Sequence, residues 1–212
     1  FGLDAVGDGA AKAATGVIHK YAGRALLIAT GSCAVHCRYC FRRHFPYAGE
    51  TAAAGQWHEA VEAIRADASI EEVILSGGDP LSLGDARLVE IVAELRTIPS
   101  VEIVRLCTRN PVTLPQRVTP ALLAALRPYH PIFVNTHFNH PAECTPEAAL
   151  ALTRLADAGF AVGNQMVLLR GINDDPATVE TLNRWLLRQR CRPYYILQCD
   201  PVGGTAHLRT PV

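Results

Sequence analysis

Short apolar runs alternate along the chain with longer segments in which apolar residues recur every three or four positions. The runs are apolar on both faces, as parallel strands covered by helices are. Six runs are expected to be strands: residues 24–30, 72–76, 102–107, 132–136, 160–168 and 194–199. Five segments between them are expected to be helices: residues 56–68, 85–96, 120–126, 146–158 and 176–190. This alternation predicts an α/β fold with a parallel sheet and right-handed crossovers.

Local signals mark several of the expected helix ends. Thr119, Thr145 and Asp175 each precede a proline, which combines a capping side chain with a proline at the first helical position. Gly159 follows the fourth helical segment and is typical of a residue that ends a helix. These signals fix three helix starts and one helix end.

The number of strand and helix units decides between two architectures. A complete eight-unit barrel usually needs about 250 residues, and this chain of 212 residues carries six units. We therefore predict a partial (β/α)6 TIM-like barrel in one compact unit, with a doubly wound sheet as the alternative. Both architectures place chemistry at the carboxyl ends of the strands.

Composition excludes several classes of protein. With 49% hydrophobic and 19% charged residues the chain is globular in composition. Twenty basic and twenty acidic residues give no net charge, so we expect no nucleic-acid partner. Apolar runs such as residues 25–29 are far shorter than the roughly 20 residues of a membrane span. Without a secretory signal pattern, we expect a cytoplasmic protein with no membrane partner. Because it begins with Phe1, we expect the chain to have lost a segment upstream.

Three of the seven cysteines lie within eight residues, directly after the first expected strand. An odd number of cysteines in this arrangement does not suit a disulfide framework. Cys33, Cys37 and Cys40 are instead expected to share a metal or cluster. A structural zinc normally has four protein ligands, which His36 or His44 could complete. A four-iron cluster held by three cysteines instead leaves one iron free for a small molecule.

The spacing C-x3-C-x-aromatic-C resembles the signature of radical S-adenosylmethionine (SAM) enzymes. Further segments resemble the lysine 2,3-aminomutase family nearly from end to end: residues 16–21, 24–27, 40–47, 76–81, 135–141, 164–165 and 193–195. Residues 40–47 are most similar to the branch that makes β-lysine for modifying elongation factor P. Residues 198–200 and 209–212 look more like the free-lysine aminomutases.

This resemblance implies a [4Fe–4S] cluster held by Cys33, Cys37 and Cys40. In the family, the free iron chelates the amino and carboxylate groups of SAM, and the reduced cluster splits the sulfonium to give a 5'-deoxyadenosyl radical. Six residues match positions that contact SAM: Tyr39, Ser76, Gly77, Gly78, His137 and Gln165.

The resemblance also implies pyridoxal phosphate and an amino-acid substrate. Lys20, Tyr21 and Arg24 match positions near pyridoxal phosphate, and the two cations suit its phosphate. Arg42 matches the residue that binds the substrate carboxylate, for which a planar guanidinium is fitted. Asp200 corresponds to one of two carboxylates that bind the distal ammonium of lysine. The N-terminal segment 1–23 is thus expected to contribute to the pyridoxal phosphate site, ahead of a radical SAM barrel over residues 24–212.

Several of these residues also have ordinary structural interpretations. The Gly-Gly-Asp-Pro segment reads as a turn at a strand end, and the three residues near pyridoxal phosphate read as a solvated basic cluster. His137 alone reads as a structural histidine, and its pairing with His140 is a weak metal motif. Asp174 reads best as part of a helix N-terminus. Four cysteines are assigned no role: Cys107, Cys144, Cys191 and Cys199.

The sequence departs from the family at its end. In the family a glycine-rich stretch follows with the Schiff-base lysine and the second ammonium-binding carboxylate, and this chain ends at Val212 before such a stretch. Only Lys12 and Lys20 are present, neither in the matching context, so no Schiff-base lysine and no catalytic residue is assigned. We expect the C-terminal family segment to be absent from this chain.

The function implied by the resemblance is that of a radical SAM aminomutase that interconverts L-lysine and β-lysine through a pyridoxal phosphate imine. The implied partners are a free amino acid and a reductant such as flavodoxin or ferredoxin, and a homo-oligomer is compatible with the sequence. Three alternatives stay open. They are a non-catalytic or truncated relative that binds the cluster and SAM, an aminomutase acting on glutamate or another amino acid, and a zinc-stapled interaction module.

Overall fold

The computed structural model describes residues 1–50 and 57–211. All six predicted strands form, with small shifts at their ends: β3 (Arg24–Thr30), β4 (Glu72–Gly77), β5 (Ile103–Cys107), β6 (Ile132–Thr136), β7 (Ala161–Leu168) and β8 (Arg192–Gln198). Each strand pairs in parallel with the next one in the chain. The predicted parallel sheet is therefore confirmed.

The five predicted helices also form: α2 (Trp57–Arg65), α3 (Asp85–Leu95), α5 (Pro120–Leu126), α6 (Pro146–Asp157) and α7 (Pro176–Arg188). The predicted start of α2 at Gln56 lies outside the described residues. Thr119, Thr145 and Asp175 each accept a hydrogen bond from a backbone amide in the first turn of the following helix, as predicted. Gly159, which follows α6, has a φ of 88° and ends that helix as predicted.

Short helical turns occupy the loops and were not predicted from the sequence. They are α1 (Tyr47–Glu50), α4 (Asn110–Thr113), η2 (Pro80–Ser82), η3 (Pro115–Arg117), η4 (Arg127–Tyr129), η5 (Pro141–Glu143) and η6 (Ala206–Leu208). Four of the seven follow strands β4, β5, β6 and β8, at the carboxyl end of the sheet. There they hold the polar segments that face the candidate site.

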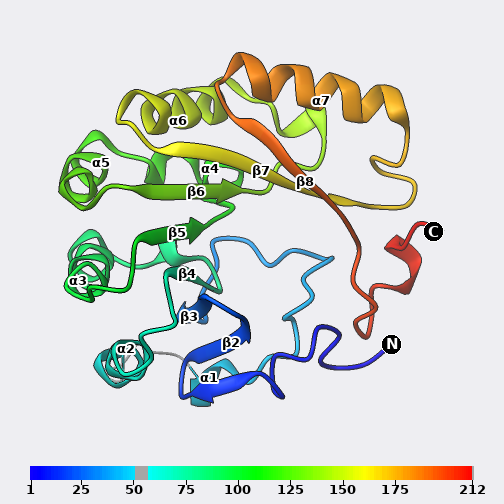
Figure 1. Cartoon of the computed structure of the whole chain (residues 1–212). Helices are drawn as coiled ribbons and strands as arrows, with labels where there is room; N and C mark the ends of the chain where they lie inside the picture. Colours follow the sequence, from blue (N-terminus) through cyan, green and yellow to red (C-terminus); the bar gives the residue numbers. More distant parts are fainter. Residues whose placement is uncertain (51–56, 212) are drawn as a thin grey trace.

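The order of the strands rejects the doubly wound alternative. The sheet runs β1 to β8 in sequence order, whereas a doubly wound sheet reverses its order at a switch point. Successive right-handed crossovers in one direction place the helices on one side of the sheet, and Figure 1 shows them along its outer side. The sheet is not closed, so the predicted partial barrel is confirmed as an open, curved sheet.

Two strands at the N-terminus were missed by the sequence analysis. β1 (Lys12–Ala14) and β2 (Val17–Tyr21) pair antiparallel and extend the sheet beyond β3. Each is joined to the next strand by a two-residue turn whose second residue, Gly16 or Gly23, has a positive φ of about 75°. The sheet therefore has eight strands in place of the six expected, and this hairpin carries Lys20 to the edge of β3.

The core lies between the sheet and the helices. Buried apolar side chains of β3 to β7 pack against one face of each of the helices α2, α3, α5, α6 and α7 in a single cluster. This explains the helical spacing of apolar residues in the sequence. β8 is an exception, because Tyr194, Tyr195, Ile196 and Leu197 are 37–56% exposed. The expectation that every strand is covered on both faces is therefore wrong for β8.

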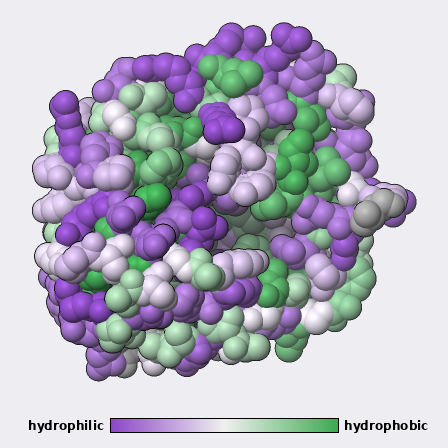
Figure 2. Space-filling model, in the orientation of Figure 1, coloured by the Kyte–Doolittle hydropathy of each residue, from purple (hydrophilic) through white to green (hydrophobic). Residues whose placement is uncertain are grey.

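The surface has no dominant character on the face shown. In Figure 2 hydrophilic residues are interspersed with smaller hydrophobic patches. Within the described ranges, every helix is too short or too polar to cross a lipid bilayer.

Candidate active site

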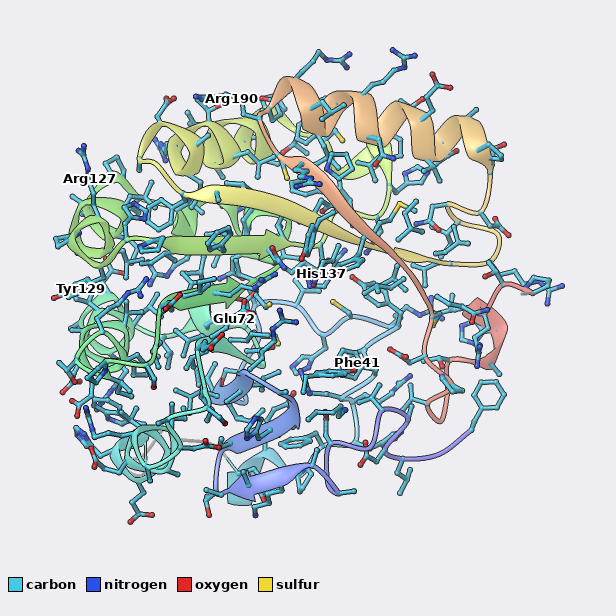
Figure 3. The ribbon with its side chains drawn as sticks, in the orientation of Figure 1. Phe41, Glu72, Arg127, Tyr129, His137 and Arg190 are labelled. Atoms are coloured by element: carbon cyan, nitrogen blue, oxygen red, sulfur yellow. The ribbon has the colours of Figure 1, made fainter. Side chains whose placement is uncertain are left out.

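One cavity lies where the cysteine loop meets the carboxyl ends of the parallel strands. Most of the predicted site residues line it: Cys33, Cys37, Tyr39, Cys40, Arg42, Ser76, Gly77, Gly78, His137 and Asp200. It is also lined by Asp79, Cys107, Thr108 and Arg109, to which the sequence analysis gave no role. Figure 3 shows His137 beyond the end of β6 and Phe41 on the cysteine loop, both toward the open side of the sheet. Arg127 and Arg190 lie near the helices at the periphery.

The three clustered cysteines are half-buried free thiols around this cavity. Burial, together with the nearby Asp79, Cys40 and Cys37, raises the pKa of Cys33 to about 11. Burial also raises the pKa of Cys40. Deprotonation of Cys33 and Cys40 is therefore favoured by a cationic partner, as binding to a metal supplies.

A preformed zinc site is not present in residues 1–50 and 57–211. No three His, Cys, Asp or Glu side chains there are placed so that they could hold one metal ion. His36 is exposed, and His44 is hydrogen bonded through Nε2 to the Gly203 carbonyl oxygen at 3.3 Å. The same holds for Cys33, Cys37 and Cys40, which all line the cavity but do not form such a group in this structure.

Two glycines allow the loop after β4 to lie directly against the cysteine loop. A Cβ atom on Gly78 would be 2.3 Å from the Ser32 carbonyl oxygen, and one on Gly77 would be 2.7 Å from the Thr30 carbonyl oxygen. Gly78 donates a backbone hydrogen bond to Thr30 at 2.7 Å. Tyr47 donates its hydroxyl to the Gly77 carbonyl oxygen at 2.6 Å. The two loops are thus joined backbone to backbone, which larger residues at these glycines would prevent.

Asp79 ties the loop after β4 to the loop after β5. Its buried carboxylate accepts hydrogen bonds from the backbone amides of Leu81, Arg109 and Asn110 and from the Thr108 hydroxyl. Burial raises the pKa of Asp79, and these four hydrogen bonds act in the opposite direction. The acid of the Gly-Gly-Asp-Pro segment is therefore a connector between strands, beyond the strand-end turn considered from the sequence.

His137 lies on the cavity wall as a neutral side chain. Burial and the nearby Arg109 lower its pKa to about 4, and a hydrogen bond with the Gln165 backbone opposes this shift. Gln165 is on β7 and is not one of the residues that line the cavity. His140 does not pair with His137, because its Nδ1 accepts the Ala142 amide at 3.0 Å and caps η5.

Arg42 is held from behind by a residue that the sequence analysis missed. Its Nε donates to Asp8 at 2.7 Å, and its Nη1 is 3.5 Å from the Ser76 hydroxyl oxygen. Asp8 is buried and also accepts from Lys20 Nζ at 3.0 Å. Since Asp8 engages Nε, the terminal edge of the guanidinium stays available to an anion in the cavity.

A second pocket, adjoining the cavity at Arg42, gathers the residues predicted for pyridoxal phosphate. Lys20, Tyr21 and Arg24 all line it. Lys20 pairs with Asp8 and Arg24 pairs with Glu72, and the side chains of Lys20 and Arg24 are 26% and 47% exposed. The donor set suits a phosphate group.

Neither lysine of the chain is free in the structure. Lys20 is held by Asp8, and Lys12 forms an ion pair with Glu50.

Asp200 follows β8 and lines the main cavity. Burial raises its pKa, while Arg209, Lys20 and Arg42 act in the opposite direction. The cavity therefore has a cation, Arg42, and an acid, Asp200, among its lining residues. Asp174, by contrast, accepts the Gly171 amide at 2.9 Å in the turn before α7, and the neighbouring Asp175 caps that helix.

Comparison with known proteins identifies the class. Residues 27–182 match the radical SAM superfamily. The structure of Streptococcus suis SuiB bound to S-adenosylmethionine has the same fold, with a TM-score of 0.65 at 11% identity, covering 88% of this chain and 43% of that one. The chain therefore belongs to the radical SAM superfamily. Membership of this family implies a [4Fe–4S] cluster and SAM as cofactors.

The resemblance to lysine 2,3-aminomutases is confirmed as well. L-lysine 2,3-aminomutase of Fusobacterium nucleatum is 49% identical over 198 residues, which make up 93% of this chain and 47% of that protein. Glutamate 2,3-aminomutase of Clostridioides difficile is 41% identical over 211 residues, or 99% of this chain and 50% of that protein. This chain thus spans about half the length of these relatives.

Proposed function

We propose that this chain is the radical SAM core of an aminomutase that interconverts L-lysine and β-lysine. The observation that carries the proposal is that Arg42 and Asp200 line the same cavity as the three clustered cysteines. A zwitterionic substrate with a second ammonium needs an anion-binding and a cation-binding group near the radical source. Glutamate would bring a second carboxylate toward Asp200, so the acid favours lysine.

The residues around the cavity fit the cluster and SAM. Cys33, Cys37 and Cys40 would hold the cluster, because three thiolates leave one iron open. Five lining residues would contact SAM: Tyr39, Ser76, Gly77, Gly78 and His137. Gln165, which does not line the cavity, would support this site through the hydrogen bond between its backbone and His137. When bound, the cluster and SAM supply the one-electron chemistry that starts the reaction. A one-electron donor such as flavodoxin or ferredoxin is then required.

His137 contributes a neutral hydrogen-bonding group to this cavity. Because its pKa is about 4, the imidazole carries no charge near neutral pH. A neutral ring does not repel the sulfonium cation of SAM, and it offers one donor and one acceptor nitrogen. Arg42, in turn, presents its terminal guanidinium edge to the substrate carboxylate while Asp8 fixes its orientation.

Pyridoxal phosphate is the third cofactor of the proposal. Lys20, Tyr21 and Arg24 would hold its phosphate end, so segment 1–23 contributes to this site. When bound, the cofactor would supply a π-system able to delocalise an unpaired electron while the amino group moves. No residue of this chain is assigned as its Schiff-base lysine.

The test is cofactor assembly and SAM cleavage under oxygen-free conditions. After reconstitution with iron and sulfide, the protein is reduced with dithionite and assayed for 5'-deoxyadenosine with and without L-lysine or L-glutamate. Cys37→Ala should abolish both the cluster absorbance and SAM cleavage, because two thiolates do not hold the cluster. Cys144→Ala, which removes a thiol outside the cavity, should retain both.

The outcomes separate the alternatives. Full SAM cleavage in Cys37→Ala would contradict the proposed cluster site. A cluster that binds SAM without cleaving it would favour the non-catalytic relative, and one equivalent of zinc without iron would favour the zinc module. Stimulation by glutamate and not by lysine would contradict the proposed substrate.

A further inference from the structure

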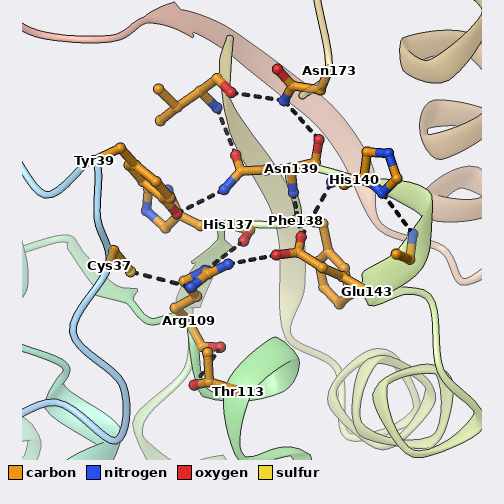
Figure 4. Close-up of polar contacts among 12 residues, drawn as sticks. Cys37, Tyr39, Arg109, Thr113, His137, Phe138, Asn139, His140, Glu143 and Asn173 are labelled. Atoms are coloured by element: carbon orange, nitrogen blue, oxygen red, sulfur yellow. Dashed lines mark hydrogen bonds and ion pairs between the residues drawn. The ribbon is translucent and has the colours of Figure 1, made fainter. Parts of the chain in front are cut away.

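Arg109 connects the cysteine loop to the loop after β6, and the function proposed above does not use it. It follows β5, and its Nη1 lies 3.2 Å from the Sγ atom of Cys37. Figure 4 shows the guanidinium between Cys37 on one side and Glu143 on the other. Of the three cysteines proposed to hold the cluster, Cys37 is thus the one with a cationic hydrogen-bond donor directly at its sulfur.

The position of Arg109 is fixed from both ends. Its backbone amide donates to Asp79 at 2.7 Å, and its Nε donates to the His137 carbonyl oxygen at 3.3 Å. Its Nη2 pairs with Glu143. These contacts leave Nη1 directed at the thiol, so the contact with Cys37 belongs to an ordered arrangement.

Glu143 is itself held in place. Its second carboxylate oxygen accepts the backbone amides of Asn139 at 2.6 Å and His140 at 3.3 Å. Asn139 in turn donates its side-chain amide to the Tyr39 hydroxyl at 2.7 Å, which returns the network to the cysteine loop. Arg109 and Glu143 thus form a partly buried ion pair, each about one-fifth exposed, whose positive end faces Cys37.

The charge of this pair bears on electron uptake. Arginine stays protonated in proteins, and the reduction potential of an iron–sulfur cluster depends on net charge, on hydrogen bonds to the sulfurs and on solvent exposure. Reduction adds one negative charge to the cluster, so a cation at a ligand sulfur stabilises the reduced form. A carboxylate behind that cation weakens the effect.

We propose that Arg109 is a positioning residue that raises the reduction potential of the cluster by its hydrogen bond and charge at Cys37, and that Glu143 moderates this effect. The inference rests on the proposed cluster site. In the step concerned, one electron passes from a low-potential one-electron donor to the cluster, taking [4Fe–4S]2+ to [4Fe–4S]+. No covalent bond forms or breaks and no proton moves in that step.

The experiment is a redox titration of the reconstituted chain with dithionite, monitored by the electron paramagnetic resonance (EPR) signal of the reduced cluster. In Arg109→Gln we expect the ratio of reduced to oxidised cluster at a given potential to fall about tenfold, equivalent to about 59 mV for a one-electron couple. Glu143→Gln should shift the ratio in the opposite direction. For Arg109→Lys the ratio of reduced to oxidised cluster should lie between those of wild type and Arg109→Gln, because lysine keeps the positive charge but lacks the planar guanidinium group.

Arg117→Gln is the matched control, because Arg117 bonds to carbonyl oxygens of Leu81 and Leu83 outside the cavity. Iron and sulfide contents verify that each variant carries a full cluster. If Arg109→Gln assembles no cluster, Glu143→Gln and Arg109→Lys decide the question. If the midpoint potentials of the variants equal that of wild type, or if the midpoint potential falls in Glu143→Gln, the proposed role of Arg109 is overturned. The proposed cluster site is not affected by that outcome. A wild-type chain that binds no iron would overturn the proposed cluster site, and this inference with it.

Discussion

At the scale of single residues, burial determines the charge of His137. A protonated imidazole loses solvation in the cavity wall and lies near Arg109, so its pKa of about 4 is below the ordinary value of 6.5. The unfolded chain therefore binds a proton as the pH falls below 6.5, while the folded chain does so only near 4. The folded state loses stability across this interval as the pH is lowered.

We therefore predict a pH dependence that can be assigned to this one side chain. Between about pH 7 and pH 5 the His137 contribution should lower the free energy of unfolding by roughly 1 to 2 kcal/mol. His137→Gln should remove that part of the dependence. The measurement is urea unfolding of the cluster-free protein at both pH values, in wild type and variant. Equal pH dependences in the two proteins would contradict the assigned shift.

At the scale of elements, the contact between the loop after β4 and the cysteine loop is the closest constraint on the site. Both lie at the carboxyl ends of the neighbouring strands β3 and β4, and Gly78 allows their backbones to touch. A methyl group at this position has no room, because Ser32 and Gly31 are backbone neighbours that no rotamer change can move.

Gly78→Ala should therefore displace the cysteine loop. We expect the free energy of unfolding to fall by about 2 kcal/mol, and iron incorporation to fall with it. Gly49→Ala is the control, because Gly49 lies within α1, has no positive φ, and a Cβ atom there meets nothing within 4 Å; this change should not lower stability. Denaturant unfolding and iron content after reconstitution measure both effects. Normal iron incorporation in Gly78→Ala would show that the close contact is not required.

The sequence allowed prediction of elements whose signal is periodic. Strands β3 to β7 and the five longer helices could be predicted, because burial of strands against helices leaves a repeating apolar pattern. The exposed strand β8 was predictable from its apolar composition alone. The hairpin of β1 and β2 could not be predicted, since its strands have three and five residues and its buried residues number only two, Val17 and Ile18. Its turns at Gly16 and Gly23 were the available signal.

The candidate site was predictable in part. Cys33, Ser76 and the other motif residues could be named because their spacing resembles a family pattern. Asp8 and Arg109 could not, since each acts through partners distant in the sequence, Arg42 and Cys37 respectively. Such contacts arise only once the strands bring the loops together.

At the scale of the whole molecule, the open barrel brings five loops, those after β3, β4, β5, β6 and β8, and the N-terminal hairpin around two adjoining pockets. The first pocket carries the proposed cluster and SAM residues, and the second carries the proposed phosphate residues. Arg42 lines both. A substrate carboxylate held by Arg42 would therefore lie between the radical source and the π-system that the reaction requires. This placement supports a single aminomutase site over two unrelated ones.

The most direct test of this account is the EPR spectrum of the reduced, reconstituted chain before and after addition of SAM. Three thiolates leave one iron without a protein ligand, so binding of SAM there should change the spectrum of the cluster. The account predicts a [4Fe–4S]+ signal whose shape changes when SAM is added. An identical spectrum with and without SAM, or no iron–sulfur signal at all, would contradict it.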